Sequence, residues 1–230
     1  MPIVDISTRL YQHFQGLLQN LPPVPPDVEW LLPLAELPET ERVFRLFLEK
    51  YYADEQPRTL ILGINPGRFG GGITNVAFTD PVNLERECGI ENSFAKRVEF
   101  SAQFVYQVIH AWGEVADFYR SFYVNSVVPF GFVKHGKNYN YYDEKPLQAA
   151  MEPLALRHLR GLVELGMNRK VCFCLGTGKN FDFLSKLNER EGIFEKVVAL
   201  PHPRFVLQYR KKEVEEYVQL FVRTLRGNLT

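Results

Sequence analysis

Apolar residues recur along the chain in two patterns, a helical spacing in some segments and short continuous runs in others. The helical spacing predicts helices over residues 6–18, 39–52, 94–112, 152–165 and 212–226, with one more helix ending at residue 187. The short runs predict buried strands over residues 59–64, 121–127, 170–175 and 196–200. Strands that alternate with helices favour a parallel sheet with helices on both faces. We therefore expect a three-layer α/β/α fold with a short, mainly parallel, four-stranded central sheet.

Glycine and proline gather between these elements. Residues 21–33 are proline-rich and predict an irregular, semi-rigid crossing. Residues 65–81 and 128–146 predict two long loops, and loops of that length are usually functional. Because the carboxyl ends of parallel strands meet at one edge, we expect the loops after the four strands to converge there and form the site.

The 230 residues are 46% hydrophobic and 23% charged, which is typical of one globular domain spanning residues 1–230. Within it, residues 1–55 are expected to form a helical extension packed on the rest. No apolar run reaches the roughly 20 residues that span a bilayer, and the N-terminus has no secretory pattern, so no membrane association is expected. The chain has 27 basic residues (Lys and Arg) and 27 acidic residues (Asp and Glu). This balance argues mildly against a protein that coats DNA but allows one local basic surface.

The chain has three cysteines, Cys88, Cys172 and Cys174. An odd, sparse count indicates a reducing compartment, and we expect the cytoplasm of a bacterium, its cytosol or nucleoid. Metal binding by these thiols is conceivable, but no further cysteine or paired histidine completes a ligand set. We therefore interpret Cys172 and Cys174 as buried small residues and expect no metal.

The sequence does not match several common functional motifs. Gly176-Thr177-Gly178-Lys179 lacks the spacing of a P-loop, and Phe181 stands where a dinucleotide fingerprint needs a small residue. The segment fits equally a plain tight turn and a strand-to-helix turn whose amides touch a phosphate. Neither a G-x-S-x-G elbow nor an H-E-x-x-H helix occurs, so the sequence lacks the motif residues of the common hydrolase and zinc-protease mechanisms.

Four short motifs, one of them the glycine-containing segment just described, follow the four expected strands. They are Asn65-Pro66-Gly67 with Phe69-Gly70 and Phe78, Asn125 before Val128-Pro129, Gly176-Thr177-Gly178, and His202-Pro203-Arg204. Over residues 58–210 their order and spacing resemble the single-strand-selective monofunctional uracil-DNA glycosylases. Each motif alone is more often structural; their joint order carries the resemblance.

The resemblance implies catalytic roles for Asn65 and His202. Cleavage of an N-glycosidic bond leaves positive charge on the sugar and negative charge on the base. Asn65 would orient the attacking water, and His202 would donate a hydrogen bond to the charged oxygen of the leaving pyrimidine. No lysine stands at a motif position to form a Schiff base, so the expected reaction is simple hydrolysis without a cofactor.

The same resemblance implies the binding residues. Asn125 would read the uracil edge with its carbonyl and amide, and Phe78 would stack on the flipped ring. Gly67 would leave room for a substituent at the pyrimidine 5-position, where a large side chain would exclude it. The remaining expected residues are Gly63 and Pro66 at the base, and Arg204, Gly176, Thr177, Arg210 and Lys211 at the DNA. The basic stretch 210–212 also fits a solvated helix start.

Some residues depart from the family pattern. The second motif continues with Phe205 and Val206 where the family has a longer, polar wedge, and Arg68 and the glycines at 70–72 are unusual there. His202 argues against the mismatch-specific glycosylases, and three cysteines argue against the iron–sulfur branch, which needs four. We expect a monomeric enzyme of base excision repair acting on DNA that contains uracil or 5-substituted uracil. The alternatives are a catalytically weakened module that binds modified bases or nucleotides, and an enzyme acting on a small nucleoside or phosphorylated ligand.

Overall fold

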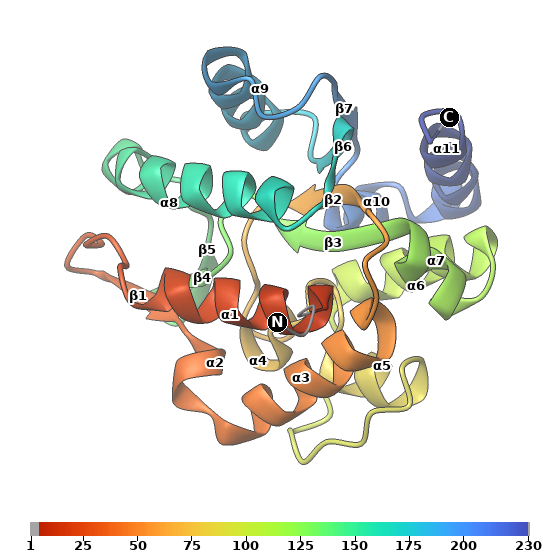
Figure 1. The fold of residues 1–230 in the computed structure, drawn as a ribbon, viewed down its shortest axis with the longest axis horizontal. Helices are drawn as coiled ribbons and strands as arrows, with labels where there is room; N and C mark the ends of the chain where they lie inside the picture. Colours follow the sequence, from red (N-terminus) through yellow and green to blue (C-terminus); the bar gives the residue numbers. More distant parts are fainter. Residues whose placement is uncertain (1–4, 230) are drawn as a thin grey trace.

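The computed structural model describes residues 5–229 (Figure 1). Its central sheet contains four parallel strands in the order β3–β2–β6–β7. The strands are β2 (Thr59–Gly63), β3 (Phe122–Ser126), β6 (Asn168–Leu175) and β7 (Val197–Leu200). The expected four-stranded parallel sheet is confirmed, and each strand end lies within two residues of its predicted position.

Helices cover both faces of this sheet, which confirms the three-layer α/β/α fold. The elements α6 (Phe100–Trp112), α7 (Val115–Ser121) and α11 (Val214–Arg226) lie on one face, and α8 (Lys145–Glu164) and α9 (Lys179–Glu191) on the other (Figure 1). Ile61 and Val124 point toward the first group, where they pack with Val105 and Phe221. Cys174 points toward the second, since Asn180 of α9 donates to its sulfur at 3.2 Å. Within residues 5–229, no helix combines the length and apolar character needed to cross a membrane.

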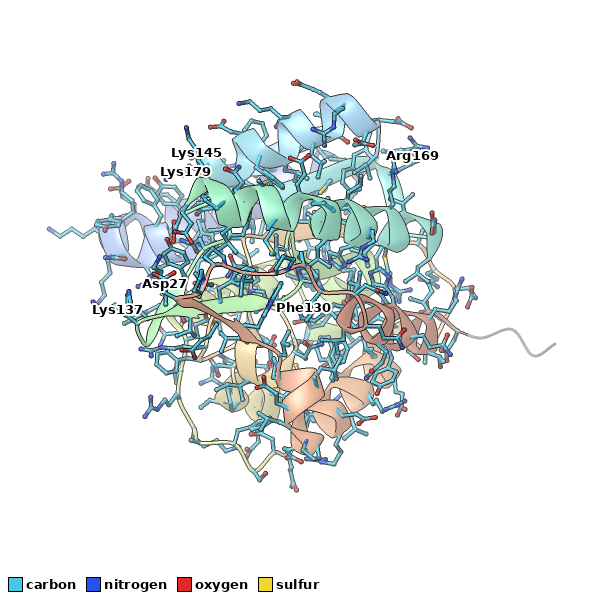
Figure 2. The ribbon with its side chains drawn as sticks, turned by 90° about the vertical axis from the view of Figure 1, so that its left-hand side faces the viewer. Asp27, Phe130, Lys137, Lys145, Arg169 and Lys179 are labelled. Carbon is cyan, nitrogen blue, oxygen red and sulfur yellow. The ribbon has the colours of Figure 1, made fainter. Side chains whose placement is uncertain are left out.

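The N-terminal helices α1 (Ile6–Leu18), α2 (Pro33–Glu36) and α3 (Pro38–Tyr52) share the apolar core of the sheet. Phe14 of α1 meets Phe44 and Phe130 edge-on, with ring centroids 5.4 and 6.1 Å apart. Figure 2 shows Phe130 in the interior of the molecule. The helices expected over 6–18 and 39–52 are thus confirmed; the first four residues of the expected extension lie outside the described part.

A second sheet contradicts the irregular segments expected at 21–33 and 128–146. Strands β1 (Val28–Leu31), β4 (Gly131–Lys134) and β5 (Lys137–Tyr139) form an antiparallel sheet in the order β1–β4–β5. The β4–β5 turn uses His135 and Gly136 with φ of 50° and 68°, as a two-residue hairpin requires. These strands are only three or four residues long, too short to show an alternating pattern against the surrounding prolines and aromatics.

Several helix boundaries also differ from those expected. α6 begins at Phe100 rather than 94, and α8 begins at Lys145 rather than 152 because Pro153 lies inside the helix instead of starting it. The other unpredicted elements are one-to-two-turn helices too short for a periodic signal. They are α2, α4 (Gly71–Thr74), α5 (Pro81–Arg86), α7, α10 (Pro203–Tyr209) and the 3-10 turn η1 (Lys211–Glu213), after which α11 begins at Val214.

Candidate active site

A cavity of about 300 Å³ opens at the carboxyl edge of the parallel sheet. Asn65, which follows β2, and His202, which follows β7, both line this cavity. Phe78, from the loop between α4 and α5, lies in the same wall. The structure therefore brings these three side chains, which are far apart in sequence, to one opening.

The amide of Asn65 is held by the end of the β4–β5 hairpin and the segment that follows it. Its Nδ2 donates to the carbonyl of Tyr139 at 3.1 Å, and its Oδ1 accepts from the N–H of Tyr141 at 3.0 Å. These two bonds fix which end of the amide is the carbonyl. Because a carbonyl oxygen has two lone pairs, Oδ1 keeps one acceptor position.

The imidazole of His202 caps the first turn of α10. Its Nδ1 accepts a hydrogen bond from the N–H of Arg204 at 3.2 Å, which places the ring proton of the neutral form on Nε2. Burial, helped by the positive charge of Arg204, lowers the pKa of His202 to about 4. Near neutral pH the ring is therefore uncharged and has one N–H to donate.

Phe78 occupies a strained position beside His202. Its φ of 53° lies in the left-handed region, which typically costs a bulky residue about 1–2 kcal/mol. The ring centroids of Phe78 and His202 are 6.1 Å apart. Gly63 makes this possible, because a Cβ there would lie 2.6 Å from Cζ of Phe78. Pro66 also lines the cavity. Gly63 does not line it but lies against the Phe78 ring.

The space beside Gly67 is bounded by a carboxyl and an amide. A Cβ at Gly67 would lie 3.1 Å from Oε1 of Glu99 and 3.3 Å from Nδ2 of Asn138. Glu99 precedes α6, and both residues line the cavity. Burial first, then the negative charge of Asp80, raises the pKa of Glu99 to about 7, against the opposing effect of Arg204. Sequence reasoning missed Glu99, because nothing in its local sequence connects it with Asn65.

Asn125 lies behind the cavity wall, where Ser126 takes the lining position. The Asn125 amide donates to Oη of Tyr123 at 3.0 Å, and its carbonyl accepts from the N–H of Ser126 at 2.8 Å. Each end of the amide keeps one further hydrogen-bonding position. The side chain is nearly buried and does not line the cavity.

The expected DNA-binding residues differ in their position relative to the cavity. Arg204 lines the cavity, but Gly176 and Thr177 lie outside its wall, just before α9. Arg210 pairs with Glu213 at 3.6 Å, and Lys211 is exposed in η1. The three cysteines are buried thiols, and no group of three or more His, Cys, Asp or Glu between residues 5 and 229 is arranged to hold a metal ion.

Comparisons with known proteins agree with this arrangement. A family profile described as the uracil DNA glycosylase superfamily matches residues 49–226. The crystal structure of wild-type SMUG2 from Pedobacter heparinus is similar to this chain, with 37% sequence identity, a TM-score of 0.94 and 98% of each chain covered. No curated protein matches. The chain therefore belongs to the uracil DNA glycosylase superfamily and, as the four motifs predicted, to its single-strand-selective monofunctional family.

Proposed function

We propose that this chain hydrolyses the N-glycosidic bond of uracil, or of a 5-substituted uracil, in DNA as a step of base excision repair. Membership of the superfamily makes it a DNA glycosylase; the base and the residue roles are the proposal. The observation that carries it is the meeting of Asn65, His202 and Phe78 in one cavity at the sheet edge. A flipped base entering there would find an aromatic ring, a fixed amide and a neutral imidazole.

Asn65 positions the attacking water in this mechanism. Its Nδ2 is anchored on the Tyr139 carbonyl, so the free lone pair of Oδ1 has a fixed direction. An amide is too weak a base to take the proton early, and it acts by holding the water near the anomeric carbon. The water oxygen forms the new bond to the anomeric carbon as the C–N bond to the base breaks; the base leaves as an anion, and the proton released from the water passes to solvent.

His202 stabilises the departing base. Its Nε2–H donates to the pyrimidine oxygen on which negative charge gathers, and removing one such donor typically lowers kcat by roughly 10²–10³. A neutral donor suits this role because it needs no proton from solvent. The pKa of about 4 keeps His202 in this form over the neutral range.

Base selection involves Phe78 and Asn125. Phe78 stacks on the ring, and Asn125 offers its amide and carbonyl to the uracil edge. Gly67, Gly63 and Pro66 shape the remaining space; the substituent at the 5-position lies beside Gly67, facing Glu99. No lysine is found among the described lining residues, which supports water rather than an amine as the nucleophile.

A cleavage assay tests the proposal. A labelled single-stranded oligonucleotide with one uracil is incubated with the enzyme and treated with alkali, which breaks the strand at an abasic site. We expect cleavage by the wild type, loss of at least about 10² in rate for Asn65→Ala, and unchanged rate for Asn20→Ala. Asn20 is an exposed asparagine at the end of α1 and serves as the matched control. Salt-dependent binding without cleavage would instead indicate a binding module, and no interaction with DNA would refute both.

A further inference from the structure

A second, wider groove of about 690 Å³ adjoins the base cavity. The two share Glu99, Ser101, Asn138 and Arg204 as a common wall. The rest of the groove is lined by Arg68, Phe69, Arg97, Val98, Phe100 and Lys137. These residues come from the loop after β2, the segment before α6 and the β4–β5 hairpin. A chain leaving the base cavity on this side would enter the groove directly.

The groove has a positive charge that the protein as a whole lacks. Its four cations, Arg68, Arg97, Lys137 and Arg204, form no ion pair with any carboxylate of residues 5–229, and its one described acid is Glu99. On other surfaces many cations are paired, as in Arg42–Glu39 and Lys134–Asp27, both at 2.8 Å. In a chain with 27 basic and 27 acidic residues, this concentration is local.

Aromatic and apolar side chains lie among these cations. The guanidinium groups of Arg68 and Arg97 stand 4.6 and 5.3 Å from the centroid of the Phe69 ring. Phe100 is 67% exposed and Val98 is 50% exposed, among the most exposed large apolar side chains of the described structure. Cations that follow a backbone and aromatic rings that stack on bases are the two components of single-stranded nucleic acid channels.

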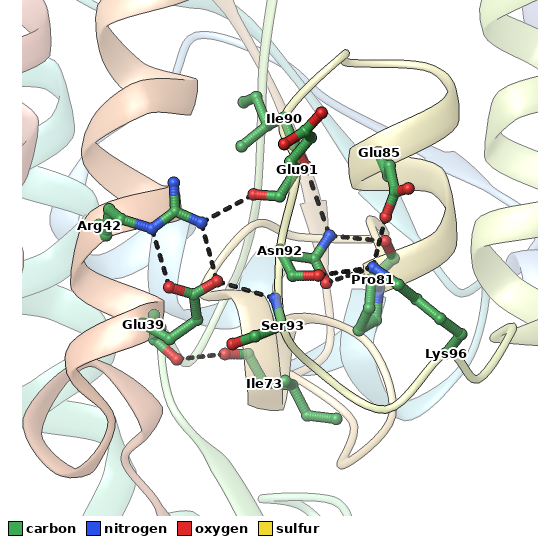
Figure 3. Close-up of polar contacts among 11 residues, drawn as sticks. Glu39, Arg42, Ile73, Pro81, Glu85, Ile90, Glu91, Asn92, Ser93 and Lys96 are labelled. Carbon is green, nitrogen blue, oxygen red and sulfur yellow. Dashed lines mark hydrogen bonds and ion pairs between the residues drawn. The ribbon is translucent and has the colours of Figure 1, made fainter.

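The wall that carries Arg97 and Phe100 is held in place before any ligand binds. Figure 3 shows the preceding segment tied to α3: Arg42 donates to the carbonyl of Glu91 at 2.7 Å, and Glu39 accepts from the N–H of Ser93 at 2.9 Å. Lys96 donates to the carbonyl of Asn92 at 2.8 Å. A preformed wall lowers the entropy lost on binding.

The opposite wall is similarly fixed. Asn138 of the hairpin accepts from the backbone N–H of Arg68 at 3.0 Å, and the Arg68 guanidinium donates to the carbonyl of Gly136. The loop after β2 and the hairpin that carries Lys137 therefore form one surface. Figure 2 shows Lys137 at the outer edge of the molecule.

We propose that this groove holds the DNA strand that continues from the flipped nucleotide, with its phosphates on Arg68, Arg97 and Lys137. A neighbouring unpaired base stacks on the exposed ring of Phe100. The inference rests on the proposed function, since it places the rest of the substrate once the base is in the cavity. Arg210 and Lys211 do not line the groove, so the inference assigns them no phosphate contact.

Binding measured at several salt concentrations tests the phosphate contacts. The probe is a short single-stranded oligonucleotide with one 2′-fluoro-deoxyuridine, whose glycosidic bond resists hydrolysis, and the readout is fluorescence anisotropy. For single strands each phosphate contact contributes about 0.7 to the slope of log K against log salt. We expect Arg97→Gln and Lys137→Gln each to lower the slope by about that amount, equally for different flanking sequences.

Lys170→Gln is the matched control, because it removes one positive charge at the start of β6, the opposite edge of the sheet from the cavity. Figure 2 shows its neighbour Arg169 on the far side of the molecule from Lys137. The control should keep the wild-type slope. Wild-type slopes in both groove variants, or an equal loss in Lys170→Gln, would overturn the inference.

Phe100→Ala tests the stacking contact. We expect it to weaken binding of the oligonucleotide roughly 5- to 100-fold while leaving binding of a single 2′-fluoro-deoxyuridine nucleotide unchanged. Leu46→Ala, at another exposed apolar side chain on α3, should leave both unchanged. Equal weakening of both ligands by Phe100→Ala, or no weakening, would contradict the inference.

The same samples separate this inference from the proposed function. Lys137→Gln should raise the KM for cleavage of a uracil oligonucleotide, because the variant lacks one contact to the substrate strand. A wild type that binds through the groove but never cleaves refutes the proposed function alone. A wild type that cleaves, with groove variants of unchanged KM and salt slope, refutes the groove alone.

Discussion

Replacing Glu99 by glutamine should stabilise the folded protein in mildly alkaline solution, although it alters a residue of the candidate active site. The Glu99 carboxyl faces Gly67 and Gly70 and accepts no hydrogen bond from any residue between 5 and 229. Burial and the charge of Asp80 raise its pKa from 4.5 to about 7, although Arg204 opposes them. The ionised form is therefore disfavoured in the folded state.

The sign and size follow from the two pKa values. Below pH 4.5 the carboxyl is protonated in both states, and above about pH 7 it is ionised in both. Between these values the folded state holds the extra proton, so this group's contribution to stability rises as the pH falls from 7 to 4.5. One pKa unit corresponds to about 1.4 kcal/mol, so the full penalty above pH 7 is about 3 kcal/mol. Since Glu99 lines an open cavity and is only partly buried, solvent screening lowers this figure, and we expect about 2 kcal/mol.

Urea and thermal unfolding of the Glu99→Gln variant and the wild type measure this difference. Glutamine removes the charge and keeps the shape, so at about pH 8 the variant should be more stable by about 2 kcal/mol, or roughly 4–8 °C in Tm. At about pH 4 the two should agree, because the wild-type carboxyl is then neutral. Glu49→Gln, at an exposed acid on α3, is the control and should show no such pH-dependent gain. A variant no more stable at pH 8, or equally stabilised at pH 4, would refute the reasoning.

Three further outcomes are expected. Gly63→Ala should displace the Phe78 ring, since the new Cβ would lie 2.6 Å from Cζ, and should lower kcat/KM roughly 5- to 100-fold; unchanged kinetics would contradict this. His202→Ala should lower kcat by roughly 10²–10³, and because its pKa is about 4, the wild-type rate should show no ionisation of this ring near pH 6.5. Burial lowers the pKa of His13 to about 4 and that of His158 well below 6.5, so stability measured by urea unfolding in the Glu99→Gln background should fall as the pH drops from 6.5 toward 4; a flat profile would exclude this.

The central sheet was predictable because each of its strands contains an apolar run and is followed within three residues by a glycine, proline or asparagine. Such runs are read from the sequence without knowledge of their partners. The β1–β4–β5 sheet was not, because Trp30 and Phe132 become neighbours only through pairing, with ring centroids 4.8 Å apart. The residues that flank Trp30 and Phe132 in the sequence give no indication of that contact. The same limit hid Glu99, whose position beside Gly67 depends on how the segment before α6 is tied to α3.

The motifs identified the reacting groups, whereas the unpredicted elements orient them. Asn65 was recognised from its neighbours Pro66 and Gly67, but the direction of its carbonyl is set by backbone groups of Tyr139 and Tyr141, next to the unpredicted hairpin. His202 was recognised from the following proline, but its tautomer is set by the first turn of the unpredicted α10. An amide and a neutral imidazole act through directional hydrogen bonds and not through a net charge. Their catalytic effect therefore depends on how each side chain is oriented. The chemistry proposed for this chain therefore depends as much on the short hairpin and the short helix as on the two side chains themselves.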